Sequence, residues 1–387
     1  MRLLPAPPRI GHHARHVLVL LILLPFLFSA LRAQDKTATT SFASLSKQAE
    51  AAQDSNHLDE AVALYKKALA LNPKWIEGWF SLGTIEYDRN NYSAAARAFR
   101  QLLPLASKDG TSHAFLGLCE YELGDYDNAL KHIDEASALG IANNPQFRQV
   151  VLYHEGLLNL RKSRFEAARE ALGQICRENT GNPDALVAMG MVALRIPGSP
   201  TDAEATANAD LIPRVGHAAC LAAAQKYDDT RPEFAALVSE HPDYPNIHYA
   251  YGRFLAEVND VPAAVQQFQL EIKNNPKDIT SRLEIAANEY KVDSAAGIPY
   301  AEEAVRLAPQ VAFGHYLLGL LYLDTNSAEK ALPELQIATK AFPKDPQIYF
   351  ALGTAYSRTG NKEKAAEARA TFEKLKKQSD ANSKATY

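Results

Sequence analysis

The chain has 387 residues, 47% of them hydrophobic and 22% charged, with a formal net charge of -4. This hydrophobic content is enough to bury a large core, which excludes a predominantly disordered chain. The weak negative charge excludes a basic field that would draw the chain onto phosphates, so we expect no nucleic-acid partner.

The first 33 residues have the pattern of a secretory signal. Arginines without any acidic residue precede an unbroken apolar run over residues 17–30, and polar sequence begins at Gln34. The run is shorter than the roughly 20 residues that cross a bilayer. This favours a signal that is cleaved after Ala30 or Ala33. We therefore expect export to the periplasm or the exterior, with no membrane span after cleavage. The alternative is an inner-membrane anchor formed by an uncleaved 17–30 segment.

The rest of the chain repeats with a period of about 34 residues. Four prolines close successive candidate repeats, at positions 242, 276, 309 and 343, and their spacings are 34, 33 and 34. Each repeat begins with an apolar stripe, such as Trp79, Leu82, Gly83 and Tyr87, whose spacing of three and four places it on one face of a helix. A second stripe precedes each proline, and turn residues separate the two halves. Each repeat is therefore predicted to be a helix hairpin.

This pattern of Trp, Leu-Gly and Tyr, followed by Ala, Phe and Pro, resembles the tetratricopeptide repeat family. The match is fullest over residues 76–109, 245–277 and 312–345. Repeats start near residues 42, 76, 110, 149, 183, 211, 245, 278, 312 and 346. The resemblance implies an all-α, right-handed superhelical solenoid of about ten helix-turn-helix repeats.

Two breaks in the register suggest the domain organisation. The spacing is 39 residues between the starts at 110 and 149, and 28 between those at 183 and 211. In the second break Pro197, Gly198 and Pro200 forbid a continuous helix. We interpret it either as a hinge or as a loop insertion in a rigid rod. The predicted parts are a signal (1–33), a linker (34–41), an N-terminal array (42–195), an irregular hinge or degenerate repeat (196–210), a C-terminal array with a capping helix (211–375) and a disordered tail (376–387).

The resemblance also implies a concave groove lined by the first helix of each repeat. Placed on this sequence, the groove positions are largely aromatic, which suits an amphipathic helix or an extended apolar peptide. The paired lysines and asparagines with which some family members hold a C-terminal carboxylate are absent. In the alternative interpretation, these aromatics pack against the neighbouring repeat. The expected groove residues are Phe80, Tyr87, Tyr121, Tyr153, Arg161, Arg195, Tyr249, Arg253, Tyr290, Tyr316 and Phe350.

No catalytic, metal or cofactor motif was found in the sequence. Three histidines, His113, His248 and His315, share the fourth position of their repeats with Trp79 and are interpreted as packing residues. The three cysteines, Cys119, Cys176 and Cys220, are interpreted in the same way, although Cys176 and Cys220 would pair if the fold brought them together.

The sequence thus predicts a non-catalytic scaffold of the cell envelope or exterior that binds a protein or peptide. A second hypothesis is an adaptor or substrate-binding subunit of an envelope-modifying enzyme complex, for example one with a glycosyltransferase, in which another chain is the catalyst. A third is self-association through the exposed ends of the solenoid.

Overall fold

The computed structural model describes residues 36–141, 144–202 and 207–385, with side chains between residues 41 and 381. Within these ranges the regular elements are helices and no strand occurs. The signal predicted for residues 1–33 lies outside the described residues. No described helix is long and apolar enough to span a bilayer.

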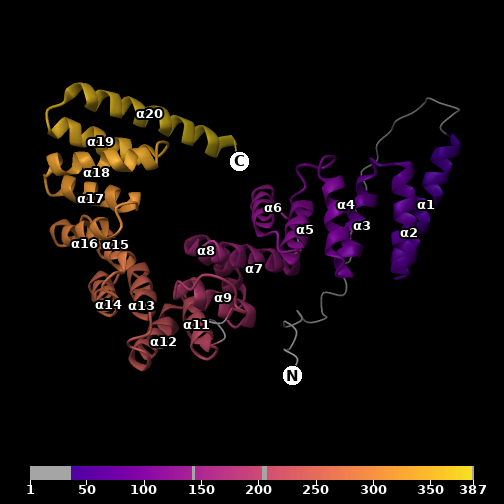
Figure 1. Cartoon of the computed structure of the whole chain (residues 1–387), viewed down its shortest axis with the longest axis horizontal. Coiled ribbons are helices and arrows are strands. Elements are labelled where there is room, and N and C mark those ends of the chain that lie inside the picture. The colour runs from indigo at the N-terminus through magenta and orange to yellow at the C-terminus, as the bar shows by residue number, and fades with distance from the viewer. Residues whose placement is uncertain (1–35, 142–143, 203–206, 386–387) are drawn as a thin grey trace. The chain divides into compact units, whose positions relative to one another are not determined.

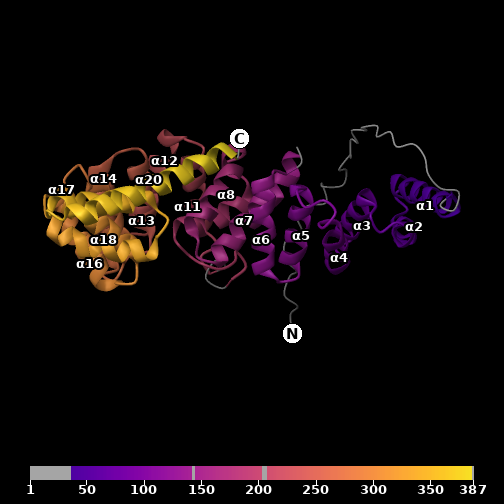
Figure 2. The ribbon, with the colours of Figure 1, turned by 90° about the horizontal axis from the view of Figure 1, so that it is seen from above.

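The chain divides into two compact parts, an N-terminal unit (Met1–Ala171) and a C-terminal unit (Leu172–Tyr387). In Figures 1 and 2 the helices of each unit follow one another in chain order. The N-terminal unit contains α1 (Lys36–Asp54), α2 (Leu58–Leu71), α3 (Ile76–Asp88), α4 (Tyr92–Leu102), α5 (Gly110–Glu122), α6 (Tyr126–Leu139) and α7 (Pro145–Arg161). Helix α8 (Phe165–Glu178) crosses the boundary. The C-terminal unit contains α9 (Pro183–Ala193), α11 (Leu211–Ala223), α12 (Tyr227–Glu240), α13 (Ile247–Glu257), α14 (Val261–Asn274), α15 (Ile279–Glu289), α16 (Ser294–Leu307), α17 (Ala312–Asp324), α18 (Ala328–Ala341), α19 (Pro346–Arg358) and α20 (Lys362–Ala385).

The expected all-α fold of stacked hairpins is confirmed. Its turns depend on one backbone conformation, because the fifteenth residue of most repeats has a positive φ that ends the first helix. Asparagine and glycine adopt this left-handed conformation at little cost, and they occupy most of the turns: Asn56, Asn90, Gly124, Asn259, Asn326 and Gly360.

The fourth residue of a repeat ties its first helix to the turn before it. Trp79 Nε1 donates to the carbonyl oxygen of Pro73 at 2.9 Å. His248 Nε2 lies 3.0 Å from the Pro242 oxygen, and His315 Nε2 lies 2.9 Å from the Pro309 oxygen. In these repeats the position holds a large side chain with a hydrogen-bond donor, and histidine supplies both. These two histidines therefore have a structural role in the hairpin.

A polar contact recurs between the second helix of one hairpin and the first helix of the next. It joins residues that are 20 apart in sequence, and its chemistry changes from repeat to repeat. The pairs are Lys66 with Glu86 at 3.1 Å, Arg100 with Glu120 at 2.7 Å, Glu302 with Tyr322 at 2.5 Å and Gln336 with Tyr356 at 2.8 Å. Since Glu86 and Glu120 are only 3% and 1% exposed, each carboxylate needs its partner to offset the cost of burial.

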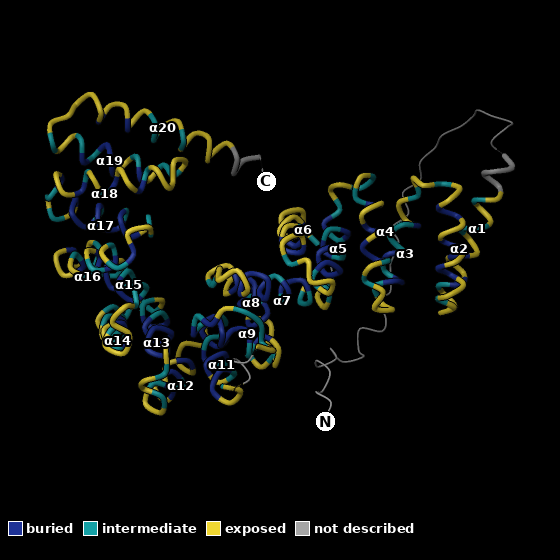
Figure 3. The backbone as a smooth tube through the Cα atoms, in the orientation of Figure 1, coloured by how far each residue is buried: buried dark blue, intermediate teal, exposed yellow. Residues whose placement is uncertain are grey.

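The first helices form the more buried layer of the C-terminal unit. Eight residues of α13 are buried, against three of α14, and Figure 3 shows the same contrast along the tube. A second helix needs only one apolar stripe, because its opposite face meets water.

The repeat is irregular between α9 and α11. Residues 196–202 form no helix, and residues 203–206 lie outside the described part of the chain. Here α9 and α11 pack directly on each other. A Cβ atom added at Gly190 would lie 2.0 Å from the Ile212 carbonyl oxygen, and one added at Gly216 would lie 1.8 Å from the Leu186 oxygen. Only glycine permits this approach of two backbones.

Two predicted segments differ from the structure. Helix α1 begins at Lys36, so most of the expected linker 34–41 is helical, and α20 continues to Ala385 through most of the tail that was expected to be disordered from residue 376. The sequence of α20 is rich in alanine, lysine and glutamate, which are strong helix formers. Their local preference extends the helix beyond the end of its partner α19.

The close approach of α9 and α11 leads to a stability prediction. Gly216→Ala is expected to lower the free energy of unfolding by roughly 1–3 kcal/mol, the usual cost of overpacking, because the obstructing atom belongs to the backbone. The measurement is urea denaturation followed by circular dichroism. The control is Gly173→Ala, whose Cβ atom would be 3.6 Å from its nearest neighbour and should raise stability by up to about 1 kcal/mol through helix propensity. Equal effects of the two substitutions would contradict the argument.

Candidate functional site

An aromatic ladder crosses the first helices of the N-terminal unit. Phe115 of α5 is at its centre, with ring centroids 5.3 Å from Tyr87, 6.0 Å from Phe80 and 4.5 Å from Phe147. These four residues are half-buried and come from α3, α5 and α7. Beneath them Phe99 is fully buried and stacks on Phe115 at 5.2 Å. We use the name aromatic ladder for Phe80, Tyr87, Phe115 and Phe147.

The predicted groove residues of the N-terminal unit both pack and remain partly accessible. Tyr121 is half-buried, with its ring 4.7 Å from His154 of α7, and Tyr153 is half-buried beside the same histidine. Arg161 is exposed, and its guanidinium lies 4.1 Å from the ring centre of Tyr126. The aromatics of this surface therefore bridge neighbouring helices and still leave part of each ring at the surface.

Burial also affects the ionisable groups beside the ladder. It raises the pKa of the Tyr87 hydroxyl far above its ordinary value, and the neighbouring Tyr92 adds to this effect. Burial likewise raises the pKa values of the Asp88 and Glu122 carboxyl groups. Tyr87 therefore stays protonated and able to donate a hydrogen bond at any physiological pH.

In the C-terminal unit, Tyr249 departs from the prediction. It is 4% exposed, so its ring belongs to the core and offers little area to a ligand. Arg195 covers it, with the guanidinium 5.3 Å from the ring centre and Nη1 3.4 Å from the hydroxyl oxygen. Arg253 is half-buried and donates to Glu284 Oε1 at 2.5 Å, which joins α13 to α15. Helix α13 keeps the expected register, with His248 at position four and Gly252 at position eight, so this ring packs inward without a shift of register.

The remaining predicted residues lie near the C-terminal end. Tyr290 follows the last residue of α15 and is half-buried. Tyr316 is half-buried on α17, and burial together with the charge of Asp345 raises the pKa of its hydroxyl. Phe350 is 56% exposed and contacts Phe372 at 5.4 Å. Of these three, only Phe350 presents most of its side chain to solvent.

Two ladder residues were not predicted from the sequence. Phe115 is at the sixth position of its repeat, next to the expected fifth. Phe147 precedes the expected start at 149, because α7 begins earlier, at Pro145. Phe147 could have been found from the 39-residue spacing between the repeat starts at 110 and 149, because the extra residues lengthen the first helix of the next repeat.

One buried carboxylate holds the helix that carries Tyr249. Glu271 of α14 is 1% exposed and accepts hydrogen bonds from the backbone N–H groups of Asn246 at 2.9 Å and Tyr249 at 3.3 Å. These groups lie at the N-terminal end of α13, where unsatisfied N–H donors and the helix dipole favour an anion. Burial nevertheless raises the pKa of Glu271.

Among the described residues no group of three or more histidine, cysteine or acidic side chains has the geometry to hold a metal ion. The described chain does contain a disulfide, between Cys176 of α8 and Cys220 of α11. This decides in favour of pairing, which the sequence left open. Cys119 is buried with a free thiol.

Known proteins resemble this chain mainly through its repeats. A family model described as tetratricopeptide repeat matches residues 46–110, 80–144, 221–279 and 316–379, which together exceed half of the chain. Cellulose synthase operon protein C of Escherichia coli K12 is 29% identical over 72% of this chain. The chain spans only 23% of that relative.

Among solved structures, MamA from Desulfovibrio magneticus RS-1 is 22% identical, with a TM-score of 0.39, over 43% of this chain and 97% of its own. A tetratricopeptide repeat protein from Parabacteroides merdae is 17% identical, with a TM-score of 0.33, over 82% of this chain and 99% of its own.

The raised pKa of Glu271 predicts how stability depends on pH. The stability that its protonated form contributes is fully present below the ordinary value of 4.5 and is lost as the pH rises through the raised folded value. Glu271→Gln removes the charge and keeps an oxygen acceptor. Relative to the wild type, the variant is therefore expected to gain stability as the pH rises above 4.5, as measured by urea denaturation. Glu363→Gln, at an exposed site, is the control. The same gain in both variants would rule out burial as the cause.

Proposed function

The chain belongs to the tetratricopeptide repeat family, and from this premise we propose that it is an exported scaffold which holds another protein by an apolar or helical segment. The solenoid of stacked hairpins is the interaction scaffold itself. The proposal adds the compartment, the binding surface and the kind of segment that is bound.

The aromatic ladder carries the proposal for the binding surface. Its four half-buried rings form a continuous contact across α3, α5 and α7. Aromatic rings provide a large contact area with few rotatable bonds, so little conformational entropy is lost when a partner covers them. The hydroxyl of Tyr87 adds a donor at one edge. An apolar face of a helix, or an extended apolar peptide, matches this chemistry.

Two observations support the proposed export. Residues 1–33 have the composition of a secretory signal, and Cys176 and Cys220 form a disulfide. Structural disulfides persist in oxidising compartments such as the bacterial periplasm and are rare in the cytosol. Both features favour a chain that works outside the cytoplasm.

A second candidate function is an adaptor in a complex that makes or modifies a glycan. The observation in its favour is the relative named for a cellulose synthase operon, which aligns over 72% of this chain. In this version another chain performs the catalysis and the present solenoid positions it. Both candidates use the same ladder, so they differ in the identity of the partner.

The ladder proposal is tested by crosslinking the exported protein in cells and then measuring how the purified partner binds. Phe80→Ala with Phe147→Ala is expected to weaken binding at least tenfold, because buried aromatic anchors often contribute more than about 2 kcal/mol each. Phe342→Ala, at an exposed aromatic outside the ladder and the expected groove, is the matched control and should bind normally. Circular dichroism and urea midpoints establish that both variants fold. A folded ladder variant that binds like the wild type would overturn the proposal, and the partner recovered distinguishes the two candidate functions.

The disulfide gives a separate prediction. Cys176→Ser with Cys220→Ser is expected to lower the free energy of unfolding by about 2–4 kcal/mol. A reducing agent should lower wild-type stability by a similar amount and leave the double variant unchanged. Burial raises the pKa of the Cys119 thiol to about 12, so this thiol is inert at neutral pH and Cys119→Ser is the control. Wild-type stability that does not respond to reduction would contradict a structural role for the disulfide.

A further inference from the structure

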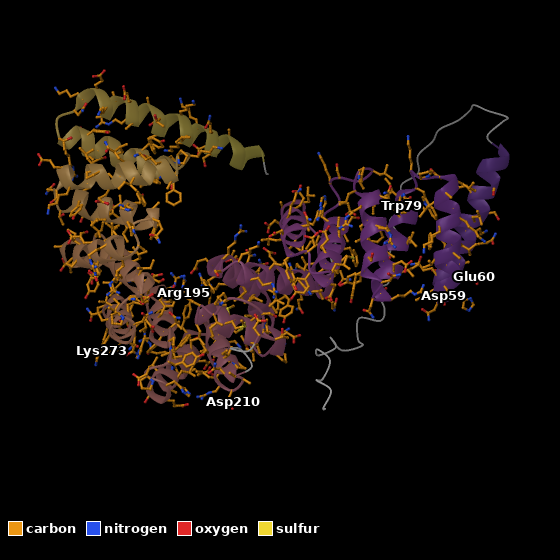
Figure 4. All side chains as sticks on the ribbon, viewed as in Figure 1. Asp59, Glu60, Trp79, Arg195, Asp210 and Lys273 are labelled. Carbon is orange, nitrogen blue, oxygen red and sulfur yellow. A yellow bond between two sulfur atoms is a disulfide. The ribbon has the colours of Figure 1, made fainter. Side chains whose placement is uncertain are left out.

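A pocket of about 420 Å³ lies between α2 and α4 in the N-terminal unit, above α3. Its lining is mostly apolar and includes Trp79, Leu82 and Ala98 beside the buried carboxylate of Glu86, and its positive charges are those of Lys66, Arg97 and Arg100. Figure 4 labels Trp79 on α3. We propose that this pocket, which we call the outer pocket, is a second binding site, and that it takes a peptide segment in which an apolar side chain lies next to a carboxylate.

The outer pocket exists because position 23 of this repeat carries a small side chain. The residue at position 23 stands over the residue at position four in three repeats. Gln267 Oε1 lies 2.7 Å from His248 Nδ1, and Glu334 Oε2 lies 2.5 Å from His315 Nδ1. In the third case the ring of His132 is 5.7 Å from that of His113.

In the repeat of Trp79, position 23 is Ala98. Its methyl group is too short to reach across the indole ring. The indole of Trp79 is fixed by its hydrogen bond to the Pro73 oxygen, so it does not move into the space that the short Ala98 side chain leaves. The pocket is therefore a gap with a fixed apolar floor, and a side chain of a partner has the size to fill it.

The charges at the rim define the ligand. Lys66 is balanced by Glu86 at 3.1 Å, and Arg100 by Glu120 at 2.7 Å. Arg97 is exposed and hydrogen-bonded only to Ser93 of its own helix, and it has no carboxylate partner among the described residues. One positive charge thus remains at the rim. A single carboxylate of the ligand neutralises this charge, because a guanidinium binds a carboxylate with a charge-assisted hydrogen bond.

The size of the pocket limits the apolar part. Pockets of roughly 300–1,000 Å³ hold small ligands, so this one accepts one or two side chains. Since its depth is apolar and its charge lies at the rim, an aliphatic or aromatic side chain enters first and the carboxylate meets Arg97. A glutamate or aspartate adjacent to leucine or phenylalanine has this arrangement.

The outer pocket and the aromatic ladder use different faces of α3. Trp79, Leu82 and Glu86 follow one another at spacings of three and four and share one face, whereas Phe80 and Tyr87 lie about a third of a turn away. The two sites are therefore independent, and a segment bound at one does not cover the other.

Trp79 provides a direct reporter for the test. The chain has two tryptophans, so a Trp75→Phe background assigns the fluorescence to Trp79 alone. The probes are two blocked hexapeptides with a central Leu-Phe pair, one flanked by glutamates and the other by lysines. The acidic peptide is expected to change Trp79 emission with saturation, and the basic peptide is expected to have at least tenfold weaker binding.

Two substitutions test the geometry. Ala98→Gln places in the pocket the side chain that Gln267 has in its own repeat, and Arg97→Gln removes the unpaired charge. Each is expected to weaken binding of the acidic peptide about tenfold, which corresponds to the loss of one charge-assisted contact or of the apolar subsite. Lys131→Gln, at the equivalent exposed position one repeat later, is the matched control.

The outcomes are distinct. Equal binding of the two peptides, or binding that survives Ala98→Gln in a folded protein, would overturn the proposal. Loss of binding in Lys131→Gln as well would indicate a general charge effect and would also overturn it. The ladder variant Phe80→Ala with Phe147→Ala should leave the Trp79 response unchanged, which separates this site from the groove.

Discussion

Several hairpins depend on one large side chain of the second helix that packs against a glycine of the first helix. Phe99 lies against Gly83, Phe268 against Gly252, and Leu335 against Gly319, so closely that an added Cβ atom would be 2.6–2.7 Å from the nearest side-chain atom. Burying such a side chain contributes roughly 1.5–3 kcal/mol. In these hairpins the contact fixes how near the two helices lie.

Once this contact is set, the other positions of the repeat differ in how freely they vary. In several repeats position four donates a hydrogen bond to the preceding turn, and tryptophan, histidine and tyrosine all do so. The contact across 20 residues requires only two polar partners, and it appears as a salt bridge in one pair and as a neutral hydrogen bond in another. Position 23 has no such requirement. A binding site therefore arises most easily at a position whose side chain is not needed for packing between the helices, such as Ala98.

The sequence predicted the features that recur and missed those that occur once. The period, the hairpins and the structural role of His248 and His315 follow from spacing alone, because every repeat solves the same packing problem. The burial of Tyr249 and the contribution of Phe147 do not. Phe147 depends on the longer first helix of its repeat, and Tyr249 on the packing of its ring beneath Arg195. A fixed count of positions reproduces neither. Two of the four ladder residues, Phe80 and Tyr87, were therefore predicted from the sequence. Phe115, at the centre of the ladder, is at position six of its repeat, whereas the prediction named position five.

The break between α9 and α11 shows how the C-terminal unit tolerates a missing layer. Without a regular second helix in the described part of this segment, α9 and α11 meet backbone to backbone through Gly190 and Gly216. The side chains around these glycines are buried, among them Met189 and Met191 of α9 and Ile212 and Val215 of α11. The disulfide closes the chain over 44 residues around this place, from Cys176 to Cys220. It restricts the unfolded chain across the segment that departs from the regular repeat. The covalent link thus adds to the packing of α9 on α11, and it does so only where the compartment keeps it oxidised.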